Sequence, residues 1–367
     1  FPDPARIEEA AEVLAAARPP LVVTSEIGRD PAAVAALVAL ADVAAVQVVE
    51  ASPVHANFPA AHASHAGYVF GSQVHDAVAR ADAILVIDSD APWFAARVRP
   101  RPGAKIIQLA SDPYFSRYPM RNYPCDVPIA AEPGVALPLL VRALRKRIRP
   151  ADVLARRRRL EAAHRRTRRA WAQAAAAEAN RTPIGFQWAS KCIDAVLGED
   201  TIVVNEYPLE LRQAPARGPG TYFGAAHSGG LGWGFGAALG VKLARSDRTV
   251  IATLGDGAYI FGVPSACHQA SRQHALPLLV VVFNNSAWDE VKKGTTNVHP
   301  DGWAASTGVF PFAAIEPAPE FETMARAFGG HGERVDAPQK LPAALRRALD
   351  VVRKEGRQAL LNVVCRR

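Results

Sequence analysis

The chain has 367 residues, of which 49% are hydrophobic, and its formal net charge is +8. A chain of this length is too long for one compact core and suits two domains that each bury a sizeable interior. No apolar stretch is long enough to cross a bilayer, and residues 1–10 lack the basic and apolar regions of a signal peptide. The four cysteines include no CxxC pair and are typical of reduced thiols, so we expect a cytoplasmic protein with no membrane association, disulfide framework or zinc site.

The first 150 residues alternate between helical and strand patterns. Residues 4–17 and 31–44 have the apolar periodicity of helices. Short apolar runs bounded by turn residues predict strands at 19–28, 45–50, 81–90 and 104–112. Alternation of helices with continuously apolar strands is typical of a parallel sheet covered on both faces. We therefore predict a first doubly wound α/β domain over residues 1–150.

Residues 151–182 are rich in arginine and alanine and end at NRTPIG, which breaks a helix. Eight arginines lie in RRRRLEAAHRRTRRA: Arg156, Arg157, Arg158, Arg159, Arg165, Arg166, Arg168 and Arg169. A solvated helix that links two domains is the simpler interpretation, and binding of an acidic partner, such as a nucleotide tail or another subunit, is the alternative. No zinc-finger, RNP or GXXG motif accompanies the charge, so we expect no nucleic acid as a partner.

A second alternating pattern occupies residues 183–367. Helices are predicted at 185–197, 228–244, 264–274, 320–330 and 341–356, and strands at 201–206, 249–257, 276–285 and 359–365. The stretch 286–320 looks irregular and is expected to border a functional site. The pattern predicts a second doubly wound parallel sheet, so the fold class is α/β with two such domains.

Two polar motifs end buried strands of the second domain: LGDG, which contains Asp256, and FNN, which contains Asn285. They are about 30 residues apart, the length of one βαβ unit, so two parallel neighbouring strands should bring them to one crevice. Their carboxylate and amide oxygens are hard ligands, and Gly255 and Gly257 let an anion approach the backbone. This combination is typical of Mg²⁺ bridging a diphosphate, and we expect Asp256 to be exposed at the strand tip.

The succession of GDG, a helix and NN resembles the cofactor-binding motif of thiamine-diphosphate enzymes. Residues 220–257, GTYFGAAHSGGLGWGFGAALGVKLARSDRTVIATLGDG, are similar to the same stretch of benzoylformate decarboxylase and of acetolactate synthase large subunits. The resemblance covers nearly all of the second, diphosphate-binding domain, and the first domain resembles the central domain of that superfamily. It implies thiamine diphosphate and Mg²⁺ as cofactors, with Asp256 and Asn285 as side-chain metal ligands and the backbone carbonyl of Ala287 completing the metal site.

The resemblance also assigns residues to the organic cofactor. Leu231, which follows Gly230 in GGLG, matches the bulky residue that wedges beneath the thiazolium and bends the cofactor, so that the pyrimidine amine reaches the reactive carbon. Tyr207, Pro208 and Leu209, in NEYPL, match the strand end that contacts the diphosphate. The hydroxyl side chains of some relatives are absent there, so backbone contacts are expected.

Other candidate residues surround these motifs. Ala258 stands where relatives often have the serine of GDGS and offers only a backbone N–H, and about two more residues than in the commoner family pattern separate the motif halves. Trp288 matches a position that is often aromatic and could wall the substrate pocket, although packing alone also explains it. His227, before the SGGLG turn, could shuttle protons near neutral pH, and a structural histidine is the alternative.

Relatives begin with a pyrimidine-binding domain whose glutamate protonates the pyrimidine ring, whereas this sequence starts in what resembles the central domain. The resemblance therefore implies either an enzyme of two polypeptides, of which this is the large subunit, or a shortened chain. In both cases the catalytic glutamate would come from a pyrimidine-domain subunit in a hetero-oligomer, such as a dimer of heterodimers. This chain alone would then be inactive.

The implied reaction is decarboxylation or carboligation of a 2-oxo acid or related acyl substrate, and the sequence does not decide between the two. A lyase that cleaves 2-hydroxyacyl-CoA is a third interpretation, with the Arg-rich segment as a CoA contact. A regulatory or binding subunit of the same fold is the alternative from another class, and the intact Asp256 and Asn285 argue against it. The first domain has no G-x-G-x-x-G motif or P-loop, so a structural role is favoured there, while FAD, ADP or CoA binding stays open.

Overall fold

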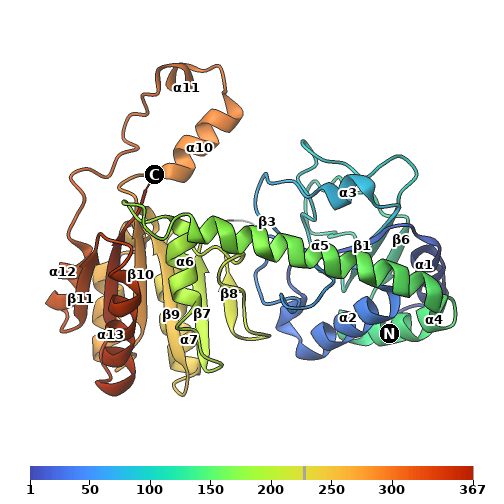
Figure 1. Ribbon diagram of the computed structural model, residues 1–367, viewed down its shortest axis with the longest axis horizontal. Coiled ribbons are helices and arrows are strands. Elements are labelled where there is room, and N and C mark those ends of the chain that lie inside the picture. The colour runs from blue at the N-terminus through green and yellow to red at the C-terminus, as the bar shows by residue number, and fades with distance from the viewer. Residues whose placement is uncertain (226–228, 367) are drawn as a thin grey trace. The chain divides into compact units, whose positions relative to one another are not determined.

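The computed structural model describes residues 1–225 and 229–366 (Figure 1). The chain forms two compact units, one comprising Phe1–Trp171 with Ala216–His227 and the other comprising Ala172–Pro215 with Ser228–Arg367. The chain passes from the first unit to the second within the helix α5 (Pro150–Ala176).

The first unit is built on a sheet of six strands in the order β3-β2-β1-β4-β5-β6, all paired in parallel. The strands are β1 (Pro20–Thr24), β2 (Gln47–Ala51), β3 (His65–Val69), β4 (Ala83–Ile87), β5 (Lys105–Ala110) and β6 (Val127–Ala130). The predicted parallel sheet is confirmed. The edge strands β3 and β6 were not predicted, because Gly67 and Pro128 interrupt their apolar pattern and edge strands tolerate such residues.

The helices of the first unit are α1 (Pro4–Ala16), η1 (Ile27–Arg29), α2 (Pro31–Ala44), α3 (Asp76–Arg80) and α4 (Pro133–Arg145). Both predicted helices begin with the same device, an aspartate N-cap followed by proline. Asp3 accepts the amide N–H of Ala5 at 2.9 Å, and Asp30 accepts that of Ala32 at 2.9 Å. The apolar faces of α1, α2 and α4 form one core against the sheet.

The Arg-rich segment is a helix, as predicted: α5 has 27 residues, and the only one of them that is buried among the described residues is Ala175. Arg156 donates to the carbonyl of Ala44 at 3.1 Å and Arg157 to that of Asp42 at 2.7 Å, so two of its arginines satisfy the C-terminal end of α2. His164 Nδ1 lies 3.2 Å from the carbonyl of His65 on β3.

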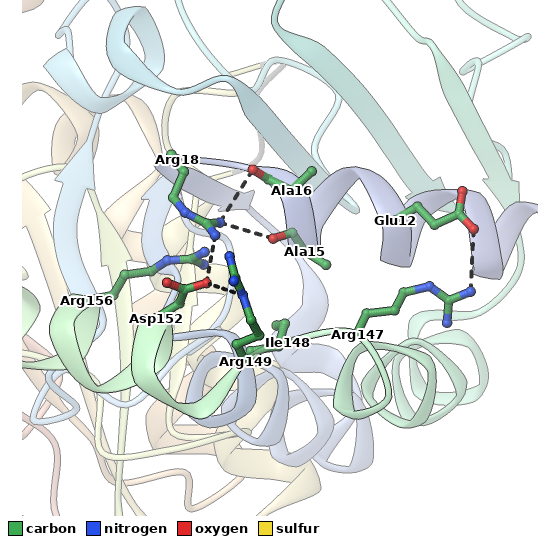
Figure 2. Close-up of a pocket in the computed structure, with 9 residues that line it drawn as sticks. All are labelled: Glu12, Ala15, Ala16, Arg18, Arg147, Ile148, Arg149, Asp152 and Arg156. Atoms are coloured by element: carbon green, nitrogen blue, oxygen red, sulfur yellow. Dashed lines mark hydrogen bonds and ion pairs between the residues drawn. The ribbon is translucent and has the colours of Figure 1, made fainter.

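A hollow of about 350 Å³ lies between the ends of α1 and α4 and the start of α5 (Figure 2). It is lined by Glu12, Ala15, Ala16, Arg18, Arg147, Ile148, Arg149, Asp152 and Arg156. The Arg18 guanidinium donates to the carbonyl of Ala15 at 3.1 Å and pairs with Asp152 at 2.8 Å (Figure 2). The Arg18 side chain therefore caps the C-terminal carbonyls of α1 and pairs with an acid in the first turn of α5, which is a structural role.

The second unit contains parallel strands in the order β11-β12-β10-β9-β7. They are β7 (Thr201–Glu206), β9 (Thr249–Gly255), β10 (Leu279–Asn284), β11 (His331–Val335) and β12 (Ala359–Val364). β9 and β10 are parallel neighbours over the register Leu279↔Ile251 to Phe283↔Gly255, which confirms the predicted adjacency of the two polar motifs. The short strand β8 (Tyr222–Gly224) belongs to the stretch that clusters with the first unit, where Gly224 N donates to Val54 O at 2.8 Å.

The helices of the second unit are α6 (Phe186–Asp194), α7 (Gly234–Ala244), α8 (Asp256–Phe261), α9 (Pro264–Gln273), α10 (Asp289–Val298), α11 (Trp303–Thr307), α12 (Phe321–Ala327) and α13 (Leu341–Lys354). Two expectations were wrong. The strand predicted at 249–257 ends at Gly255, and Asp256 begins α8. The stretch 286–320 contains α10 and α11, whose glycine and threonine content hides the helical pattern. No helix among the described residues has the length and apolar character needed to span a bilayer.

Candidate functional site

Two side-chain oxygens converge where β9 and β10 end. Asp256 is the first residue of α8, and its Oδ2 accepts the amide N–H of Ala287 at 3.3 Å. Asn285 follows β10, and its Oδ1 accepts the same N–H at 3.2 Å. One backbone amide thus donates to a carboxylate oxygen and an amide oxygen that come from the ends of adjacent strands.

Asp256 is buried, with 2% of its surface exposed, which corrects the expectation of an exposed carboxylate at a strand tip. The physical reason is that α8 begins at this residue, so the carboxylate turns back to accept Gly257 N at 2.8 Å and the Ala287 amide. Burial raises the pKa of the Asp256 carboxyl, and the N–H groups around it offset only part of the rise. A cation in contact would favour the charged form.

The donor set fits a hard divalent cation. The described residues contain no group of three or more His, Cys, Asp or Glu side chains that could hold a metal ion. A metal at this place would therefore be held by one carboxylate, one amide oxygen and the backbone, with the remaining ligands from a diphosphate and water. Mg²⁺ is typically bound in this way, and zinc is not.

The turn that follows Asn285 is tightly constrained. Ser286 has φ = +54°, and its N–H is held by Asn284 Oδ1 at 3.1 Å. Trp288 packs against Gly257, where an added Cβ would lie 2.6 Å from the indole ring. An added Cβ at Gly255 would meet no atom within 4 Å. Of the two glycines in GDG, Gly257 is therefore the one that packing requires, and the proposed role of Trp288 in a substrate pocket stays a prediction.

Glu206, the last residue of β7, holds the loop that carries Leu231. Its Oε1 accepts Gly232 N at 2.5 Å and its Oε2 accepts Gly234 N at 2.7 Å, and the residue is 2% exposed. Burial raises the pKa of Glu206, and these two N–H groups oppose that effect. Gly230 and Gly232 have positive φ angles of 114° and 88°, and Leu231 between them is 48% exposed. Glu206 was not singled out in the sequence; the available signal was an acid at the end of a strand with an apolar centre, TIVVNE.

The three residues assigned to the diphosphate lie in the turn after β7 and differ in solvent exposure. Tyr207 is 66% exposed and has φ = +83°, a left-handed conformation that costs free energy in a residue with a large side chain. Pro208 and Leu209 are buried, and the Leu209 amide donates to Asn205 Oδ1 at 3.0 Å. Only Tyr207 presents a side chain to solvent, and Asn205 is a second turn-holding residue that sequence reasoning missed.

Two further candidates can be placed or set aside. Ala258 is buried in the first turn of α8, so it contributes backbone and no accessible side chain. His227 lies outside the described residues.

Two models of one protein family match this chain. Residues 7–140 match the central domain of thiamine pyrophosphate enzymes, and residues 206–363 match their C-terminal TPP-binding domain. The chain belongs to the thiamine pyrophosphate enzyme family. Every predicted cofactor and metal residue of this chain, from Tyr207 to Trp288, lies inside the region matched to the TPP-binding domain.

Relatives of this chain include an acetolactate synthase large subunit from Mycobacterium tuberculosis, which is 35% identical over 146 residues, 40% of this chain and 24% of the relative. A benzoylformate decarboxylase from Pseudomonas aeruginosa is 29% identical over 163 residues, 43% of this chain and 28% of the relative. Among solved structures, a 4-hydroxybenzoylformate decarboxylase from Rhodococcus jostii RHA1 superposes with a TM-score of 0.73 at 21% identity, covering 99% of this chain and 64% of that one. The matches thus span about a quarter of each curated relative and under two thirds of the solved structure.

Proposed function

We propose that this chain is the large, cofactor-binding subunit of an enzyme that uses thiamine diphosphate and Mg²⁺ to decarboxylate or carboligate 2-oxo acids. The observation that carries the proposal is the convergence of Asp256 Oδ2 and Asn285 Oδ1 on the Ala287 amide. With the carbonyl of Ala287, these two buried oxygens at the ends of adjacent parallel strands would supply three of the six oxygen ligands that Mg²⁺ takes when it also binds a diphosphate. Membership of a family defined by TPP binding supports the identity of that diphosphate.

Different residues would bind different parts of the cofactor. Asp256, Asn285 and the carbonyl of Ala287 would hold Mg²⁺, and the turn at Tyr207 would lie along the diphosphate. Leu231, half exposed on the loop held by Glu206, would support the thiazolium ring. Bound there, thiamine diphosphate supplies a carbon nucleophile and an acceptor for the electrons released when a bond beside the substrate carbonyl breaks. The protein positions the reacting groups and excludes water.

We assign the pyrimidine end of the cofactor to a separate pyrimidine-domain subunit that carries the catalytic glutamate, in a cytoplasmic hetero-oligomer. The two matched family models describe the central and TPP-binding domains, and one relative is itself named a large subunit, which supports a second kind of subunit. Proton transfer by His227 stays a prediction.

Cofactor retention tests the proposal. Calorimetric titration of thiamine diphosphate with Mg²⁺ should detect binding to the complex of this chain with its pyrimidine-domain subunit. Asp256→Ala should abolish retention, and Asn285→Ala should weaken it by about 1.4 kcal/mol or more, a factor of ten. Asp350→Ala, at an exposed ion pair on α13, is the matched control and should bind normally. Undiminished retention by the Asp256 variant would show that the metal is held elsewhere.

Activity is the second arm. The same complex, assayed against a panel of 2-oxo acids with and without Mg²⁺ and thiamine diphosphate, should release CO₂ only when both are present. Aldehyde as the product would identify a decarboxylase, and a hydroxy-ketone or hydroxy-acid product with a new carbon–carbon bond would identify a carboligase. Cofactor binding without turnover of any 2-oxo acid would reject the proposed substrate class and keep the cofactor site.

A further inference from the structure

The eight arginines of helix α5 divide into two groups. Three are used within the first unit: Arg156 and Arg157 donate to carbonyls in the last turn of α2, and Arg168 lies over the Trp171 ring at 5.6 Å. The other five account for more than half of the formal net charge of +8. They are exposed and make no side-chain hydrogen bond or ion pair with any described residue: Arg158, Arg159, Arg165, Arg166 and Arg169.

Contacts along one side of α5 turn these five arginines away from the first unit. Arg156 donates to the last carbonyl of α2 at 3.1 Å, and His164 Nδ1 lies 3.2 Å from a carbonyl of β3. The Trp171 ring also lies against β3, 3.3 Å from where a Cβ at Gly67 would stand. At about 100° per residue these three contact residues share one face of the helix, and the five arginines lie on the opposite face. Figure 1 shows α5 as one unbroken helix.

The opposite face has a seven-residue repeat with small residues along its centre. Arginine pairs at 158–159 and 165–166 are seven residues apart. The two members of each pair lie on either side of a line through Ala155 and Ala162, which are both exposed. Methyl groups therefore line the centre of the face, and a row of guanidinium groups borders it on each side. Residues 155–169, here called the arginine face, lie between the regions matched to the two family models.

We propose that the arginine face binds an acidic α-helix of another protein. A second helix seated over Ala155 and Ala162 can approach closely, because these side chains are small. Carboxylates that flank such a helix at a seven-residue interval would meet the arginine pairs on both sides, as the charged e and g positions of coiled coils do. Each guanidinium can donate two parallel hydrogen bonds to a carboxylate, which suits arginine better than lysine to this partner.

Charge and composition favour an acidic protein over other partners. A second copy of this chain also carries a net charge of +8, and two arginine faces would repel each other. Single-stranded nucleic acid is bound by basic surfaces that add aromatic side chains for stacking. The arginine face has alanine between its cations, and Trp171 packs inward on β3. Glu161, the one acid within the face, is half-buried, so little negative charge competes with the partner.

Fluorescence anisotropy with designed probes tests the class of partner. The first probe is a labelled peptide of four heptads, with glutamate at e and g, alanine at a and d, and glutamine elsewhere. The second has the same composition, but its glutamates are spread around the helix. The third is a DNA hairpin with as many phosphates as the peptides have carboxylates. At about 50 mM salt, where screening is weak, the full chain should bind the first probe about tenfold more tightly than either of the others.

Equal binding of the two peptides would overturn the proposal, because net charge alone would then explain it. Tighter binding of the hairpin would also overturn it and assign the face to nucleic acid. Absence of binding to any probe would show that the face is only solvated.

Charge reversal tests which arginines make the contact. Arg159→Glu/Arg166→Glu, which reverses one row, should raise the dissociation constant of the first probe by about tenfold or more. Arg97→Glu/Arg117→Glu is the matched control, since it makes the same change in net charge at two exposed arginines of the first unit outside α5. It should change binding by less than about threefold, within the range of screened long-range charge effects. Equal losses in the two variants would contradict a site on α5.

Reversal of both rows supplies a rescue. A variant with glutamate at 158–159 and 165–166 should lose the first probe and bind a peptide that has lysine in place of each glutamate, which the wild type should not bind. Glutamate is as good a helix former as arginine, so circular dichroism should show that α5 is retained. Failure of the lysine peptide to bind this variant would show that the rows do not pair with a helix. The face lies outside the region matched to the TPP-binding domain, so cofactor retention is an independent readout in every variant.

Discussion

Glu206 and Gly232 lie 26 residues apart in the chain and are joined by a hydrogen bond of 2.5 Å from the glycine amide to Oε1. The second carboxylate oxygen accepts Gly234 N at 2.7 Å. Because these amides flank the loop of Leu231 on one side, a buried carboxylate at the end of β7 sets where that side chain stands. Glu206 thus acts on the candidate cofactor site through backbone, as a positioning residue.

Replacing this carboxylate should loosen the loop. In Glu206→Gln an NH₂ group would face one of the two amides, so one charge-assisted hydrogen bond is lost at a cost of about 1–3 kcal/mol. Hydrogen exchange at Gly232 and Gly234 should therefore accelerate by about tenfold or more. Glu210→Gln, four residues further along, is the control and should leave these amides protected. Unchanged protection in the Glu206 variant would contradict the positioning role.

The adjacency of the two polar motifs was predictable from sequence. The motifs LGDG and FNN each close a largely apolar strand, and the sequence predicts a helix between them, so a parallel βαβ unit follows from periodicity and the handedness of such units. The structure pairs β9 with β10 as expected. The sequence pattern is sufficient here because the two strands and the segment between them are consecutive in the chain, so their pairing follows from local sequence alone.

The burial of Asp256 and the role of Glu206 were not predictable in the same way. The first depends on the turn at Ser286, whose φ of +54° directs the Ala287 amide at the carboxylate. The second depends on backbone amides, which every residue has and which leave no mark in a sequence. The helix α10 was missed because none of its residues is buried, so it lacks a clear apolar periodicity, and its glycine lowers helix propensity.

The two glycines of GDG should respond differently to alanine. At Gly257 the new methyl group would lie 2.6 Å from the Trp288 ring, so Gly257→Ala should destabilise the second unit by about 1–3 kcal/mol through overpacking. At Gly255 the methyl group would meet nothing within 4 Å, and Gly255→Ala should change the unfolding free energy by less than about 1 kcal/mol. Urea unfolding followed by circular dichroism measures both, and equal effects would show that Trp288 does not fill this space.

Replacing Tyr207 by glycine should stabilise the fold and weaken cofactor binding. Its φ of +83° is strained in tyrosine and unstrained in glycine, so Tyr207→Gly should raise the unfolding free energy by about 0.5–1 kcal/mol after the added freedom of the unfolded chain is included. The same change removes an exposed aromatic side chain from the proposed diphosphate turn and should weaken cofactor retention. Tyr207→Phe is the control, since it keeps the ring and the strain. A less stable glycine variant would indicate that the ring makes contacts that outweigh the strain.

Asp88 follows β4 in the first unit and has φ = +42°. Its carboxylate pairs with Arg29 at 3.0 Å, while burial, together with Glu26 and Glu132, works against the charged form. The balance raises the pKa of Asp88 to about 6, with burial as the largest cause. A carboxyl whose pKa is raised by folding stabilises the folded state when it is protonated.

The pH dependence of stability follows from that shift. Between the ordinary pKa of 3.8 and about 6, the folded state binds more protons than the unfolded state, so the contribution of Asp88 is fully present below pH 3.8 and is lost as the pH rises through 6. The loss amounts to roughly 3 kcal/mol, from about two pKa units at 1.36 kcal/mol each. Asp88→Asn resembles the protonated acid, so it should match the wild type near pH 4 and exceed its stability near pH 7, as measured by urea unfolding at constant ionic strength. Asp76→Asn, at an exposed ion pair on α3, should follow the wild-type curve within about 0.5 kcal/mol. If Asp88→Asn is instead the less stable protein at pH 7, the ion pair with Arg29 outweighs burial and the carboxylate stabilises the fold in its charged form.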